Sequence, residues 1–206
     1  MNFKPLILGL VFAIGSQVGW AEIGRVKPFR PASGDLMVIG HRGAAGDAPE
    51  NTVASIREAL RQDADAIEVD LHQSLDGVVV AIHDDTVDRT TDGEGKVANL
   101  TVAQLKELDA GAWFDIEYPG QRIPTLDEVL AATPPETTLI LELKRGSDVY
   151  PGIEARVIDT LRSAGRTNVI LKSFSVEVLA AFERLGPEFT RLSGCSEKYS
   201  GGIHEH

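Results

Sequence analysis

Short apolar runs alternate with amphipathic stretches along most of the chain from residue 36 onward. Most runs are apolar at nearly every position, which is typical of strands covered on both faces in a parallel sheet. A strand with one face in water would instead alternate between apolar and polar residues. We therefore predict six strands, the last of them weakly marked: 36–40, 66–71, 78–82, 139–143, 169–171 and 189–192.

Helical patterns lie between several of these runs. Val53, Ile56 and Leu60 share one helical face, and Asn51 just before them can cap that helix. Apolar stripes over 153–161 and 178–185 predict two more helices. This alternation of strands and helices predicts an α/β fold with a parallel sheet, and barrel enzymes of that class build their sites where the strands end.

The stretch 84–120 interrupts this alternation with many turn residues. Thr101-x-x-Gln104 is a capping-box signature and predicts one short helix inside the stretch, and Thr125-x-x-Glu128 predicts the start of the next helix after it. We expect an elaborated loop between the third and fourth strands. Its aromatic residues either form a lid over a pocket or pack the loop itself: Trp113, Phe114 and Tyr118.

Three carboxylates stand inside the predicted strands. Glu68 and Asp70 are two residues apart and so project from one face of a strand, and Glu142 and Lys144 repeat that spacing. Buried carboxylates are costly unless they are paired or bind a metal. Hard oxygen donors suit one divalent cation, Mg²⁺ or Ca²⁺, better than a soft metal. The alternative is a structural ion-pair network with Arg42 and Lys144.

Two histidines follow predicted strands, His41 after the first and His83 after the third. Beside a metal they suit general acid–base catalysis near neutral pH, and Arg42 and Lys144 offer positive charge to an anion such as a phosphate. Together these groups describe the cleavage of a phosphate ester. Two further acids are expected to support the site: Glu50, by pairing with Arg42 or holding its loop, and Asp84, by forming a turn or supporting a neighbour.

The overall charge narrows the class of partner. The 31 acidic and 20 basic residues give a formal net charge of −11, which argues against binding to nucleic acid or an anionic membrane. A single cysteine excludes a disulfide framework and a Cys-built zinc site. Residues 1–21 have the Lys4 charge, the short apolar run and the small residues of a cleaved signal peptide. We therefore expect an exported protein, periplasmic or secreted, without a stable membrane anchor.

A set of short motifs occurs in a fixed order along the chain. The motifs are HRG at 41–43, PENT at 49–52, IEVD at 67–70, DG at 76–77, HD at 83–84, RTT at 89–91, IPTL at 123–126, LELK at 141–144 and SF at 173–174. In this order they resemble the glycerophosphodiester phosphodiesterase family, over about residues 37–185. No single motif is specific, but the ordered set is.

The resemblance implies a TIM-type (β/α)₈ barrel that hydrolyses glycerophosphodiesters to an alcohol and sn-glycerol 3-phosphate. One histidine would deprotonate the glycerol 2-hydroxyl or a water, and the other would protonate the departing alcohol. The roles implied for this chain are the divalent-metal ligands Glu68, Asp70 and Glu142, the catalytic pair His41 and His83, and the phosphate-contacting cations Arg42 and Lys144.

The predicted strands fall short of the eight that a closed barrel needs. We expect residues 22–192 to form a barrel domain that is incomplete at its C-terminal end, followed by a tail without pattern at 193–206. Two other functions are therefore kept beside the hydrolase. One is a phospholipase D-like lyase that cyclises a phospholipid, which an apolar interfacial loop would favour. The other is a truncated barrel without catalytic activity.

Overall fold

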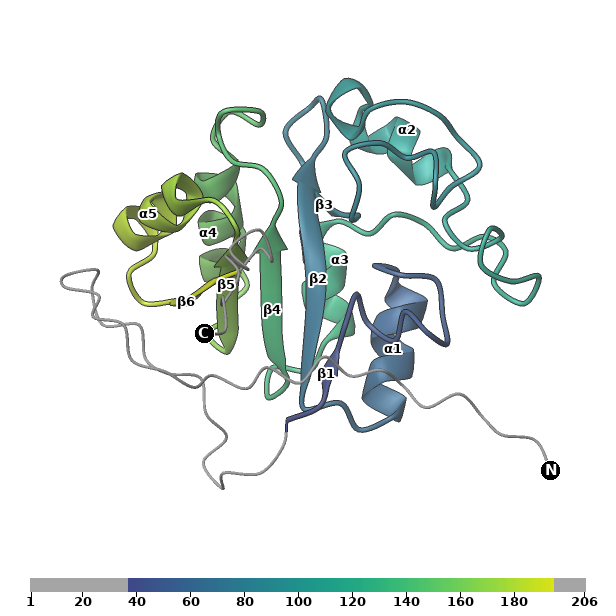
Figure 1. Cartoon of the computed structure of the whole chain (residues 1–206), viewed down its shortest axis with the longest axis horizontal. Helices are drawn as coiled ribbons and strands as arrows, with labels where there is room; N and C mark the ends of the chain where they lie inside the picture. Colours follow the sequence, from purple (N-terminus) through teal and green to yellow (C-terminus); the bar gives the residue numbers. More distant parts are fainter. Residues whose placement is uncertain (1–36, 195–206) are drawn as a thin grey trace, which may run out of the picture.

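The computed structural model describes residues 37–194, and a parallel sheet runs through it (Figure 1). The parallel strands follow the order β1-β2-β4-β5-β6, so each strand lies beside the next parallel strand along the chain. Their bounds are β1 (Ile39–Gly40), β2 (Ala66–Gln73), β4 (Thr138–Leu143), β5 (Val169–Ser173) and β6 (Thr190–Ser193).

The strand predicted at 78–82 is present, but the prediction that it belongs to the parallel sheet is wrong. β3 (Val79–Ala81) returns antiparallel along β2, with Leu71 opposite Ala81 and Gln73 opposite Val79. The link between the two strands is a tight turn, and a parallel return needs a crossover of a dozen or more residues. The described part of the chain therefore has five parallel strands where six were predicted, and the loop at 84–120 follows a hairpin.

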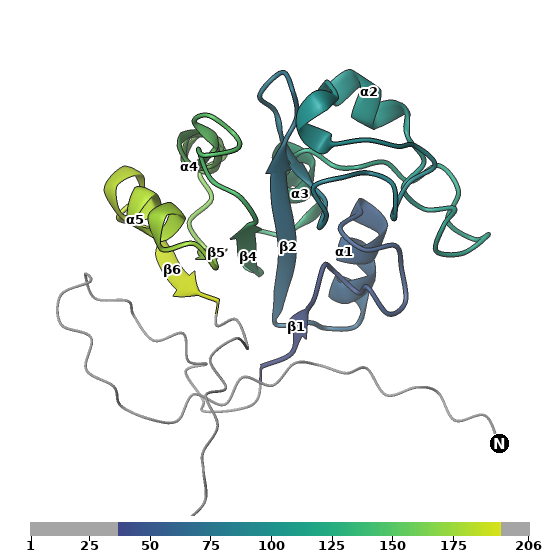
Figure 2. The same cartoon turned by 45° about the horizontal axis from the view of Figure 1, so that its top comes forward.

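Four helices lie along one face of the curved sheet (Figures 1 and 2). The odd-numbered residues of β2 and β4 face these helices and are buried with Ile56, Leu161 and Phe182 in the main core. The even-numbered residues face the other way, where Ala66, Ile140 and Ile170 form a small apolar layer. The helices are α1 (Val53–Arg61), α3 (Leu126–Ala132), α4 (Ile153–Ser163) and α5 (Val176–Leu185).

Two of the three predicted helix caps are confirmed. Thr101 and Thr125 form complete capping boxes with Gln104 and Glu128, at the starts of α2 (Val102–Glu107) and α3. The prediction that Asn51 caps α1 is wrong, because the Thr52 side chain accepts the hydrogen bond from the Ser55 amide. Asn51 has a left-handed backbone (φ 57°), which turns its side chain toward the sheet.

The loop region 84–125 has a core of its own. Val80 and Ile82 pack there with Val97 of η1 (Val97–Asn99), Leu105 of α2 and Ile123. Its aromatic residues stack edge to face, with 5.7 Å between the ring centroids of Trp113 and Phe114 and again between those of Phe114 and Tyr118. These contacts favour packing of the loop over a lid.

Within residues 37–194, β1 and β6 each pair on one side only, so the barrel stays open between them. The strand predicted at 189–192 is confirmed one residue further on, and Ser193, which was assigned to the tail, belongs to β6. The predicted signal peptide at 1–21 and the rest of the tail at 195–206 lie outside the described residues. Among the described helices, none has the length and apolar character needed to cross a membrane.

Candidate active site

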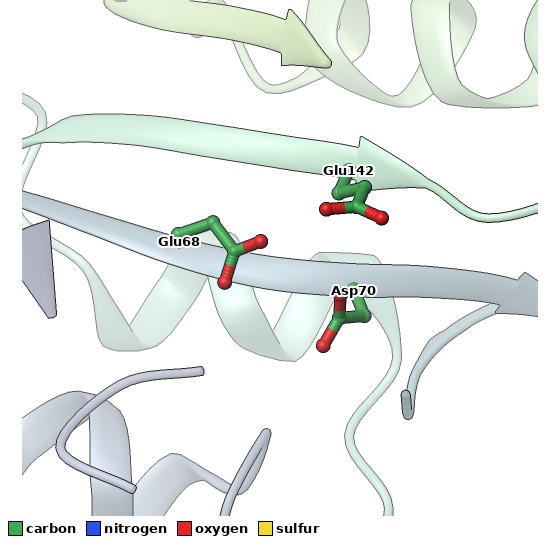
Figure 3. A group of neighbouring side chains, drawn as sticks. All are labelled: Glu68, Asp70 and Glu142. Carbon is green, nitrogen blue, oxygen red and sulfur yellow. The ribbon is translucent and has the colours of Figure 1, made fainter. Parts of the chain in front are cut away.

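The three predicted metal ligands converge on the face of the sheet away from the helices (Figure 3). Asp70 of β2 lies opposite Glu142 of β4, and Glu68 is two residues before Asp70 on the same face. All three are at most 3% exposed. One carboxylate oxygen from each lies within 4.8 Å of the others, and a cation with ligands at 2.3–2.6 Å could contact all three. The residues therefore fit one hard divalent cation.

Three basic side chains surround these carboxylates. Lys144 Nζ lies 2.6 Å from Glu142 and 3.2 Å from Asp70, and Arg42 Nε lies 3.4 Å from Asp70. Lys172 of β5 bridges Glu142 and Glu68, at 2.5 and 3.3 Å. The ion-pair network considered as an alternative is thus present, and it involves the same carboxylates that could bind the metal.

Lys172 was not predicted as a site residue. The predicted strand stopped at residue 171, while β5 continues to Ser173 and sets Lys172 opposite Glu142. The sequence did contain one indication: Lys172 is two residues after Ile170 and therefore lies on the same face of the strand. Only the register between β4 and β5 brings it to the carboxylates.

Burial and charge act in opposite directions on the pKa values in this cluster. Burial and the neighbouring Asp70 carboxylate raise the pKa of Glu68 to about 7. Burial alone would raise the pKa of Glu142, but hydrogen bonds from Lys144 and Lys172 outweigh it and lower that pKa. Burial opposes the charged form of Lys172 too, and the charges of Glu68 and Glu142 outweigh it and raise the lysine's pKa. A bound cation would favour the deprotonated form of Glu68.

The two predicted catalytic histidines stand at the rim of this cluster. His41 directly follows β1, its side chain is 63% exposed, and its Nε2 lies 3.9 Å from Glu68 Oε2. Although one side of the ring is open, the protein atoms around it remove part of its hydration, and this desolvation and the charge of Arg42 lower the pKa of His41. His83 follows β3, and its Nδ1 lies 2.6 Å from Asp84 Oδ1. Since a carboxylate can only accept, Nδ1 carries a proton and Nε2 is the His83 atom left for proton exchange.

A chain of ion pairs joins the loops that carry the two histidines. Glu50 accepts from Arg42 at 2.9 Å and from Arg89 at 2.7 Å, and Arg89 donates to Asp84 at 2.7 Å. Glu50 therefore pairs with Arg42 as predicted, and Asp84 supports His83. The sequence predicted no role for Arg89 beyond its place in the RTT motif, yet it links Glu50 to the Asp84–His83 pair.

Two more residues form hydrogen bonds that position the groups of the site. The Asn51 side-chain amide donates to Asp70 Oδ2 at 2.9 Å and its oxygen accepts from the Asp70 backbone amide at 3.0 Å, so it clamps that carboxylate. His72 Nε2 lies 3.1 Å from the His83 carbonyl oxygen, and its Nδ1 lies 2.7 Å from the Tyr150 hydroxyl. Neither Asn51 nor His72 was predicted to act at the site.

The turn after β1 brings the backbone unusually close to α1. Arg42 and Gly43 both have left-handed backbones (φ 52° and 78°), and the Gly43 amide donates to the Glu68 carbonyl at 3.1 Å. A Cβ on Gly43 would lie 2.6 Å from the Ser55 carbonyl carbon and 2.7 Å from its oxygen. This turn positions both His41 and Arg42.

Gly43→Ala is expected to lower the free energy of unfolding by about 2–4 kcal/mol, because it adds a steric contact with Ser55 to the cost of a left-handed alanine. Gly120→Ala is the matched control, since Gly120 has a similar φ of 79° with open space around it, and should cost only about 1 kcal/mol. Urea unfolding measures both. Equal losses would show that the contact with Ser55 is unimportant.

The sequence is similar to proteins of one known family. The model of the glycerophosphoryl diester phosphodiesterase family matches residues 41–200. A glycerophosphodiester phosphodiesterase of Caldanaerobacter subterraneus is 41% identical over 153 residues, which cover 73% of this chain and 63% of the relative. One from Bacillus subtilis is 37% identical over 198 residues, covering 88% and 66%.

Solved structures agree with the sequence relatives. A glycerophosphodiester phosphodiesterase from Agrobacterium tumefaciens superposes with a TM-score of 0.69 at 39% identity, over 74% of this chain and 64% of that one. A phosphodiesterase from Oleispira antarctica, solved in complex with the product sn-glycerol-3-phosphate, gives a TM-score of 0.70 at 36% identity, over 80% and 68%.

These matches settle the fold class and the family. The five parallel strands with their helices are part of a TIM-type α/β barrel, as the resemblance implied. The chain spans less than two thirds of the length of the first of these relatives. The ordered motifs, the converged carboxylates and the matched family model have one explanation: this chain belongs to the glycerophosphoryl diester phosphodiesterase family.

Proposed function

We propose that this protein is an exported, metal-dependent enzyme that hydrolyses glycerophosphodiesters to an alcohol and sn-glycerol 3-phosphate. The observation that carries the proposal is the buried cluster of Glu68, Asp70 and Glu142, flanked by His41 and His83. The family membership and the glycerol-phosphate product bound to the Oleispira antarctica neighbour support the substrate class. The signal-like sequence at 1–21 supports export to the periplasm or beyond.

The chemistry of the donor set supports Ca²⁺ or Mg²⁺ at the carboxylates. All three side chains offer hard oxygen atoms, and no sulfur or imidazole is among them. When bound there, such a cation would offset negative charge on the non-bridging oxygens of the phosphodiester. The substrate would then lie on the open side of the cluster, where His41 is exposed.

The chain's own residues would move the protons and hold the phosphate. One histidine accepts a proton from the glycerol 2-hydroxyl or from water as the new bond to phosphorus forms. If the 2-hydroxyl attacks, the product of that step is a cyclic phosphate, and a water must then open it to give sn-glycerol 3-phosphate. The other histidine donates a proton to the alcohol oxygen as its bond to phosphorus breaks. Asp84 keeps His83 in the tautomer with Nε2 available, and Arg42 and Lys144 supply positive charge toward the phosphate.

The purified full chain is expected to release choline and sn-glycerol 3-phosphate from glycerophosphocholine when Ca²⁺ or Mg²⁺ is present. A chelator should abolish this release, because the three carboxylates then lack their cation, and added Ca²⁺ or Mg²⁺ should restore it. Coupled enzymatic detection of glycerol 3-phosphate measures the rate, and phosphorus NMR identifies the product.

Two outcomes would contradict the proposed reaction. A cyclic phosphate as the final product would identify a lyase of the phospholipase D-like kind. Folded protein that releases no product at any concentration of either cation would show that the family's chemistry is not carried out by this chain.

A further inference from the structure

The Lys172 ammonium occupies a position among the carboxylates that resembles that of a bound cation. Its Nζ lies 2.5 Å from Glu142 Oε2 and 3.3 Å from Glu68 Oε1. These are two of the three side chains whose oxygens converge closely enough for one ion. Lys172 thus already binds carboxylates that a divalent cation would need.

Basic groups already surround the carboxylates where a metal would bind. Three carboxylates face three basic groups, with Lys144 bridging Asp70 and Glu142 and Arg42 beside Asp70. A divalent cation added to this set would lie a few ångströms from three positive groups, whose repulsion opposes the attraction of the carboxylates. At least one basic group therefore has to withdraw for tight binding.

Lys172 has a place to withdraw to. Its Nζ lies 5.6 Å from the centroid of the Phe174 ring, within the range of a cation–π contact. Phe174 is itself 52% exposed, so an ammonium moved toward that ring would regain water. Both described ion pairs of Lys144 are with Asp70 and Glu142, and it shows no cation–π partner within residues 37–194. Arg42 has its shorter ion pair with Glu50, outside the three carboxylates, so it competes less directly with a cation than Lys172 does.

We propose that Lys172 is an internal counter-ion that neutralises the carboxylate cluster and leaves it when a divalent cation binds, so that it weakens cation binding by this chain. The inference rests on the metal-dependent function proposed above and adds a residue that sets how much cation the site requires. Lys172 is a positioning residue here, because it acts through Glu68 and Glu142.

Replacing Lys172 with a neutral side chain tests this directly. Lys172→Gln and Lys172→Met are each expected to lower the Kd for Ca²⁺ and Mg²⁺ about tenfold or more, because the competing charge is gone. Isothermal titration calorimetry on the full chain measures the Kd without any substrate. The same variants should melt at a lower temperature than the wild type in chelator and show a larger rise on adding Ca²⁺, because their carboxylates lack a partner until the ion binds.

Two control variants separate charge from position. Lys172→Arg keeps the positive charge and is expected to keep the weak binding of the wild type. Lys106→Gln removes a lysine that pairs with Glu128, away from the cluster, and should leave the Kd unchanged. Because two neutral variants are made, a failure of one to fold leaves the other to decide.

Three results would overturn the inference in different ways. If the wild type binds Ca²⁺ but neither neutral variant binds it more tightly, Lys172 does not compete with the ion. A higher KM for glycerophosphocholine with an unchanged Kd for Ca²⁺ would instead make Lys172 a phosphate ligand. If neither the wild type nor the variants bind Ca²⁺ or Mg²⁺, the proposed metal centre itself is refuted.

Discussion

Replacing His83 with alanine is expected to lower kcat/KM for glycerophosphocholine by about 10²–10⁴-fold, the range contributed by a positioned acid or base. His83 Nδ1 donates to Asp84 Oδ1 at 2.6 Å, and Arg89 Nε donates to Asp84 Oδ2 at 2.7 Å, so the ring is well oriented. Initial rates with saturating Ca²⁺ measure the loss.

The fold should tolerate this change well. The His83 side chain is half-buried at the rim of the site, and the Asp84–Arg89 pair remains when the ring is removed. We expect the free energy of unfolding to change by about 1 kcal/mol or less and the Kd for Ca²⁺ to stay within about threefold. His41→Ala is the parallel variant for the other histidine. A His83→Ala protein that keeps a tenth or more of the wild-type rate would remove His83 from the proposed mechanism.

How far the sequence predicted this site depends on which residues are considered. Glu68 and Asp70 share one strand, so their common face follows from the two-residue period of a strand. That Glu142 joins them follows from an order of parallel strands in which β4 pairs with β2. Local spacing thus sufficed for Glu68 and Asp70, whereas Glu142 reaches them because β3 leaves the parallel sheet and lets β4 pair directly with β2.

The residues that were missed depend on information that no local pattern contains. Lys172 reaches Glu142 through the register between β4 and β5, and His72 reaches the His83 carbonyl across the β2–β3 hairpin. Asn51 was taken for a helix cap because its type and position suit one. Because its backbone is left-handed, Thr52 caps the helix instead, and the Asn51 side-chain amide donates to Asp70. Tertiary contacts decide between these two arrangements, and the local sequence does not.

The direction of β3 was missed for a related reason. An apolar run of this length is compatible with either strand direction, because periodicity describes the faces that are buried and not the partner. The short turn with Gly77 at φ 85° forces the antiparallel return. This hairpin has a consequence for the site, since it carries the chain back from the end of β2 to Asp70. There the Ile82 amide donates to the Asp70 carbonyl at 3.0 Å, and His83 follows at the rim.

Asp70→Asn is expected to raise the Kd for Ca²⁺ by about 100-fold or more and to reduce hydrolysis of glycerophosphocholine in proportion at low Ca²⁺. The substitution removes one negative charge but keeps the shape of the side chain, and an amide oxygen can still accept from Asn51. Calorimetric titration gives the Kd, and assays over a range of Ca²⁺ concentrations show whether activity follows it.

The loss of Ca²⁺ affinity should come from the missing charge and not from damage to the fold. Measuring the stability of the variant without the ion separates these two causes. Arg42 and Lys144 lose a buried partner, so the free energy of unfolding is expected to fall by about 1–3 kcal/mol in chelator. Asp159→Asn is the matched control, because this exposed aspartate lies on α4, which covers the face of the sheet opposite the cluster, and should change neither quantity. Wild-type Ca²⁺ affinity in the Asp70→Asn protein would mean that the ion binds elsewhere. The converged carboxylates would then be an ion-pair network alone, held together by Arg42, Lys144 and Lys172.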